Sequence, residues 1–117
     1  MDIKKETNSG LVISDDVIAK IAAIAATEVD GVVDVVPQHL DIKKMFKTDA
    51  PAKAVYVDDN QSMVDIYIKL KAGVKIADVA EEVQQNVKDS IQNMTGKVIF
   101  KVNVHICDVE LEKQEEK

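Results

Sequence analysis

The segment that decides the fold is Val64-Asp-Ile-Tyr-Ile-Lys-Leu70, followed by Ile76–Met94 and then by Val98–Ile106. The first piece alternates apolar and polar residues, which predicts a strand with one buried face. The second has the period of an amphipathic helix, and Gly96 follows it as a C-cap. Alternation returns in the third piece, so the order predicts a strand–helix–strand unit. The pattern allows a parallel crossover but does not require one. The expected buried stripe of the helix is Ile76, Ala80, Val83, Val87, Ile91 and Met94.

The rest of the chain predicts elements that cover this unit. Ser14 is a good N-cap for a helix over residues 15–29, because its hydroxyl can accept a hydrogen bond from free backbone N–H groups. Asp30-Gly31 ends that helix, and the polar stretch 58–62 predicts a hairpin turn. The remaining expectations are a short strand at Gly10–Ile13, a buried strand at Val32–Val36, a strand at 55–57, and a bulge or change of partner near Asp108.

Together these elements predict an α+β class: a two-layer domain with a mostly antiparallel, four- to five-stranded sheet and two helices on one face. Residues 10–111 are expected to form a single domain. Residues 1–9 are expected to form a flexible N-terminal arm, and residues 112–117 a charged tail.

The composition of the chain disfavours several classes of function and of cellular location. The net charge of −6 disfavours a protein whose whole surface binds nucleic acid. A single cysteine, Cys107, fits a reducing compartment. The N-terminal residues lack the apolar core of a secretory signal, and no apolar run approaches the roughly 20 residues that span a bilayer. We therefore expect a cytoplasmic domain with no transmembrane segment.

Enzyme and metal signatures are missing from the sequence. It has no glycine-rich phosphate-binding loop and no GxSxG, and its four glycines stand at expected element ends. His105 and Cys107 share a strand face, but a structural zinc site needs four ligands and no cysteine pair supports one. The prediction is a non-enzymatic protein without a cofactor or metal.

Two basic features remain as candidate sites. The first is a lysine-rich sheet face, which would suit RNA or another polyanion. An ordinary solvated face is the favoured alternative, since these strands lack arginine. The residues of this candidate polyanion face are Tyr67, Lys69, Lys71, Lys97 and Lys101.

The second feature is the run Asp41–Lys47, with apolar residues and lysines side by side in an acidic chain. Three lysines near an anionic membrane contribute about 3 kcal/mol, which assists attachment but does not hold a protein there alone. The alternative is a loop whose apolar residues pack on the core. The residues expected to contact a partner or a membrane are Ile42, Lys43, Lys44, Met45, Phe46 and Lys47.

The most specific of several blocks within residues 10–111 is Met94-Thr-Gly96 followed by Val102-Asn-Val104. Together these blocks resemble the alkaline-shock-protein family of Gram-positive bacteria, also called the envelope stress response family, and the likeness spans residues 10–111. It implies a scaffold or interaction module in cell-envelope homeostasis, with no catalytic residues. It also implies a protein partner, which can be a membrane-anchoring protein, and assembly into a homo-oligomer. The further blocks are Gly10-Leu-Val-Ile-Ser14, Glu28-Val-Asp-Gly-Val32 and Ile76-Ala-Asp-Val-Ala80.

Overall fold

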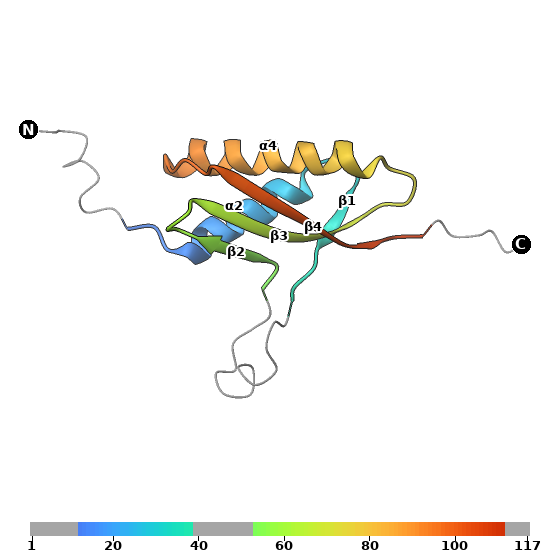
Figure 1. Ribbon diagram of the computed structural model, residues 1–117, viewed down its shortest axis with the longest axis horizontal. Coiled ribbons are helices and arrows are strands. Elements are labelled where there is room, and N and C mark those ends of the chain that lie inside the picture. The colour runs from blue at the N-terminus through green and yellow to red at the C-terminus, as the bar shows by residue number, and fades with distance from the viewer. Residues whose placement is uncertain (1–11, 39–52, 112–117) are drawn as a thin grey trace, which may run out of the picture.

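The computed structural model describes residues 12–38 and 53–111 (Figure 1). The predicted arm at 1–9, the contact residues Ile42 to Lys47 and the tail at 112–117 lie outside the described residues. In chain order the elements are α2 (Asp15–Thr27), β1 (Val32–Val35), β2 (Val55–Asp58), β3 (Met63–Leu70), α4 (Ile76–Thr95) and β4 (Lys101–Val109).

β3 is the central strand of the sheet. β1 and β2 both pair with it antiparallel on one side, and β4 pairs with it parallel on the other. The partners of β1 run from Leu70 to Ile68, and those of β2 continue from Ile66 to Met63. β1 and β2 therefore lie end to end along one edge, as one interrupted strand. The described residues confirm the predicted α+β class, with a mostly antiparallel sheet and two helices on one face, and they contain the parallel crossover that the pattern allowed.

The core lies between the sheet and its two helices. Alternate residues of β3 point into it, because successive side chains of a strand take opposite faces. α2 passes behind the sheet in Figure 1, and its small buried residues let α4 approach closely. Asn86 of α4 donates a hydrogen bond of 2.7 Å to the Ala25 carbonyl of α2, which ties the two helices together. The fully buried residues of β3 are Val64, Ile66, Ile68 and Leu70.

Both helix termini keep the local chemistry expected from the sequence. Ser14 caps α2 by accepting a hydrogen bond from the Val17 N–H, and Gly96 ends α4 with φ 80°. The buried stripe of α4, however, is Val79, Val83, Val87 and Ile91, with Val79 in place of the expected Ala80, which is only partly buried. Ile76 and Met94 are 47% and 70% exposed, so their assignment to the stripe was wrong. Both lie in terminal turns, where little of the neighbouring layer remains to cover them.

Three strand predictions also need correction. β4 begins at Lys101, because its partner β3 begins opposite at Met63; Val98 and Phe100 therefore stay outside the ladder and are exposed. Val12 and Ile13 do not belong to a strand. β1 is not buried throughout, since it is an edge strand with one open face. The bulge expected near Asp108 is confirmed, because Ile68 pairs with Ile106 and Lys69 with Asp108, leaving Cys107 as the extra residue.

Candidate interaction surface

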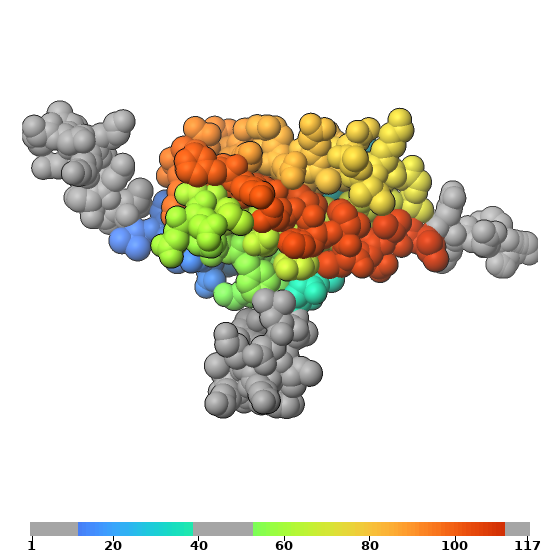
Figure 2. Space-filling view, viewed as in Figure 1, coloured from blue at the N-terminus to red at the C-terminus, as the bar shows by residue number. Residues whose placement is uncertain are grey.

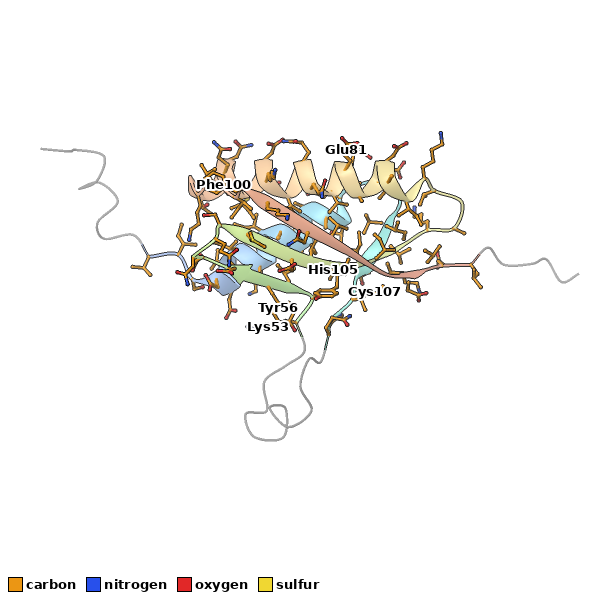
Figure 3. The ribbon with its side chains drawn as sticks, viewed as in Figure 1. Lys53, Tyr56, Glu81, Phe100, His105 and Cys107 are labelled. Carbon is orange, nitrogen blue, oxygen red and sulfur yellow. The ribbon has the colours of Figure 1, made fainter. Side chains whose placement is uncertain are left out.

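The sheet face opposite the helices, here called the open face, is turned toward the viewer in Figures 1 to 3. No described helix covers it, and residues of all four described strands project from it. Because paired residues of adjacent strands share a face, the register fixes which side chains meet there. They are Asp34 from β1; Tyr56 and Asp58 from β2; Met63, Asp65, Tyr67 and Lys69 from β3; and Lys101, Asn103, His105 and Asp108 from β4.

An aromatic cluster occupies the middle of this face. The rings of Tyr67 and His105, paired across β3 and β4, are stacked with centroids 4.2 Å apart and planes 10° apart. Tyr56 meets Tyr67 edge-on, with centroids 6.0 Å apart. The His105 Nε2 lies 3.0 Å from the Asp65 carboxylate. These four side chains therefore contact one another across β2, β3 and β4.

The cluster also reaches the two residues that flank the undescribed segment 39–52. Gln38 and Lys53 form an isolated antiparallel bridge, with N–H···O distances of 2.8 and 3.3 Å. The Tyr56 hydroxyl donates to the Gln38 carbonyl at 3.2 Å, and the Gln38 amide lies 3.6 Å from the Cys107 sulfur. Partial burial, and then the neighbouring Tyr67, raise the pKa of Tyr56 above its ordinary value. In Figure 3, Lys53 and Tyr56 lie together where the described chain stops.

The residues of the candidate polyanion face do not form one continuous patch. Lys69 lies on the open face, 3.8 Å from the Asp108 carboxylate. Lys97 stands at the hairpin end, paired with Asp59 at 3.0 Å. Lys71 follows the end of β3, and Lys101 is exposed at the start of β4. The surface is of mixed charge, because carboxylates lie next to two of these lysines. One face of the Tyr67 ring is also covered, because it is stacked on His105. Polyanion binding stays a prediction.

Sequence reasoning missed the Asp65 and Gln38 contributions to this cluster. The alternation around Tyr67 and His105 placed each residue on a strand face, but only the register of β3 against β4 puts them side by side. That register depends on the length of the crossover and on where the chain turns before Met63. Local periodicity carries no information about either.

Within residues 12–38 and 53–111, no polar or charged side chain is fully buried and no group of three or more acidic, histidine or cysteine residues could hold a metal ion. A groove of about 520 Å³ lies between the end of α2 and the outer side of α4. Its lining is acidic and amide-rich: Glu28, Val29, Asp30, Glu82, Gln85, Asn86 and Asp89.

Neither α2 nor α4, in the part of the chain described, combines the length and the apolar character needed to cross a membrane.

Comparison with known proteins gives consistent matches over nearly the whole chain. The sequence model of the alkaline shock protein 23 family, described as having a cell envelope-related function, matches residues 3–111. Uncharacterized protein Spy1614 of Streptococcus pyogenes is 32% identical over 95% of this chain and 97% of its own. Uncharacterized protein YqhY of Bacillus subtilis is 35% identical over 92% of this chain and 83% of its own. Among solved structures, a MamM CTD variant covers 80% of this chain and 94% of its own, with 19% identity and a TM-score of 0.45.

Proposed function

Because the chain belongs to the alkaline shock protein 23 family, whose function is related to the cell envelope, we propose that it is a non-enzymatic interaction module in cell-envelope homeostasis. It acts in the cytoplasm as a scaffold and reaches the membrane through a protein partner. The partner binds the segment containing Ile42 to Lys47 together with the adjoining part of the open face.

One observation carries this proposal: the aromatic cluster fixes the two residues from which the segment 39–52 departs. Gln38 and Lys53 are bridged to each other, and Tyr56 holds the Gln38 carbonyl. The hydrogen bonds and stacking of the cluster are made within the chain, as expected of a rigid platform rather than of a site that binds and releases a substrate. Ordering of these flanking residues lowers the entropic cost of presenting the segment to a partner.

The charge distribution supports a protein partner over a membrane surface alone. Three of the six contact residues are lysines, while the chain as a whole carries −6. A chain of this net charge is repelled by an anionic leaflet at long range. A protein partner can instead place a few acidic groups in contact with the local lysines, without the extended negative surface of a leaflet, and can supply the apolar contacts that Ile42, Met45 and Phe46 require.

The test is recovery of the partner from a Gram-positive host that expresses the full-length chain. After crosslinking, membrane and cytosol are separated, and half of each fraction is treated with RNase. We expect a defined membrane protein, recovered with or without RNase, to be lost when Lys43, Lys44 and Lys47 are replaced by glutamate. The melting temperature should not change, because lysine side chains are almost never fully buried in a protein core.

A matched control replaces Lys20, Lys75 and Lys88 by glutamate, which changes the net charge equally on the helical layer. This control should retain the partner. Recovery of the partner by the Lys43, Lys44 and Lys47 variant would remove the segment from the proposed function. Recovery of RNA instead, lost on RNase treatment or at raised salt, would support a polyanion-binding protein.

A further inference from the structure

The outer edge of β4 is the long unpaired edge of the described sheet. β4 has nine residues, and all its described strand pairing is with β3. The opposite edge is different, because β1 and β2 have four residues each and are interrupted at the Gln38–Lys53 bridge. An open strand edge presents unpaired N–H and C=O groups that favour pairing with another strand.

A hydrogen bond identifies which residues of β4 present their backbone outward. The Val102 carbonyl accepts from the Gln84 amide of α4 at 3.1 Å instead of from a strand. Because backbone groups alternate along a strand, Val104 and Ile106 present theirs to the same outer side. Both side chains are only partly buried, although they pack against the core. α4 therefore leaves this edge incompletely covered.

The two ends of β4 are complementary to each other. An exposed phenylalanine, Phe100, and Lys101 stand at its beginning, and Asp108, Glu110 and the exposed Leu111 stand at its end. Figure 3 shows Phe100 and Cys107 at opposite ends of the strand. Antiparallel pairing of two such strands brings the basic beginning of one against the acidic end of the other. Parallel pairing would place like charges side by side.

We propose that two copies of this chain pair through the outer edges of β4, antiparallel and about a two-fold axis near Val104. This arrangement is isologous, so each favourable contact occurs twice. Lys101 faces Asp108 and Glu110 of the second copy, and Phe100 lies close to the second Leu111. The Val102 carbonyl keeps its bond to Gln84, because a carbonyl oxygen has a second lone pair for the new strand.

In this dimer the sheets of the two copies form one continuous sheet, and the open faces of both copies lie on the same side of it. Figure 2 shows the atoms of β4 as a stripe on the surface of the open face, next to those of α4. The second copy also covers Val104 and Ile106, which the isolated chain leaves partly exposed. This inference does not rest on the proposed envelope partner, since it concerns the purified chain alone.

The experiment is sedimentation of the purified full-length chain from micromolar to millimolar concentration. We expect a monomer–dimer equilibrium whose Kd rises about tenfold in Lys101→Glu, because each reversal disrupts two symmetric contacts. Glu110→Lys should have a similar effect, and the double variant Lys101→Glu/Glu110→Lys should restore the dimer. Glu110 is preferred to Asp108 for this exchange, because Asp108 also pairs with Lys69. Lys88→Glu, on α4, is the control and should leave the Kd unchanged.

A second measurement tests the axis directly. A spin label at Asn103→Cys in a Cys107→Ser background should give a shorter intermolecular distance than a label at Glu81→Cys on the outer side of α4. A chain that is monomeric at every concentration would overturn the proposal. So would a dimer that is indifferent to both reversals, a double variant that does not recover, or a longer distance at position 103 than at position 81.

Discussion

The two faces of β3 differ in what they contribute to the molecule. Toward the helices, Val64, Ile66, Ile68 and Leu70 are all 0% exposed and hold the layers together. Toward the open face, Asp65, Tyr67 and Lys69 are only half-buried, and each contacts a side chain of a neighbouring strand. One strand thus supplies stability from one face and an organised surface from the other. Neighbouring residues should therefore respond differently to the same substitution.

The largest expected effect is that of Ile66→Ala. This substitution leaves a cavity in a close-packed layer and should lower the free energy of unfolding by about 2–5 kcal/mol. Its neighbour Tyr67 is larger, but Tyr67→Ala should lower the free energy of unfolding by less. Lost stacking on His105 accounts for about 0.5–1.5 kcal/mol of that decrease, and any packing area that is lost adds to it. Urea unfolding of both variants measures the difference. Equal losses would show that the open face is part of the stabilising core.

The comparison also shows what the sequence could predict. Alternation along residues 64–70 identified both faces of β3, since that period depends only on local geometry. The same reasoning placed Phe100 in a strand. Local alternation does not show where the partner strand begins, and β3 begins at Met63, which pairs with Lys101. Likewise, the cluster of Tyr67, His105 and Asp65 depends on a parallel register between distant segments. Local patterns therefore predicted the elements and the class, but not the contacts between elements.

A smaller effect on stability is expected at Gly31, which follows the end of α2 on the side of the sheet that the helices cover. Gly31 has φ +102°, and an added Cβ would lie 3.0 Å from a methyl group of Val79 and 3.3 Å from one of Val74. Gly31→Ala should lower the free energy of unfolding by about 1–3 kcal/mol, because backbone strain and overpacking combine. Gly73 is the matched control. It has φ +82° but nothing within 4 Å of an added Cβ, so Gly73→Ala reports strain alone.

The two glycine variants separate space from backbone conformation. Thermal unfolding should give a lower Tm for Gly31→Ala than for Gly73→Ala. If the two Tm values coincide, crowding against Val79 and Val74 contributes nothing to the loss of stability. The helix-covered side of the sheet is then packed less tightly around Gly31 than around Ile66.

The smallest effect is expected at the hairpin end of the sheet, where Asp15, Asp59 and Lys97 meet at the surface. The hydrogen bond from Lys97, and then that from Asp15, lower the pKa of Asp59, whereas the hydrogen bond shared with Asp59 raises the pKa of Asp15. Asp59 therefore stabilises the fold above its unfolded pKa, and this contribution is lost as the pH falls through its lower folded value. Asp15 has the opposite sign, because its raised pKa makes the fold lose stability as the pH rises. The two dependences partly cancel, so the effect should be clearer in titration than in unfolding.

Lys97→Met should raise the pKa of Asp59 toward its ordinary value, because the largest cause of its depression is removed. Carboxyl carbon shifts measured by NMR across the acidic range report this directly. Lys101→Met is the control, since Lys101 is exposed and its open-face position lies outside the Asp15–Asp59–Lys97 contact. An unchanged Asp59 midpoint in Lys97→Met would mean that the 3.0 Å ion pair is not populated in solution. A shifted midpoint with an unchanged Tm would show that the Asp15–Asp59–Lys97 contact forms but does not contribute measurably to the stability of the core. These three residues would then resemble those of the open face, whose contacts organise the surface.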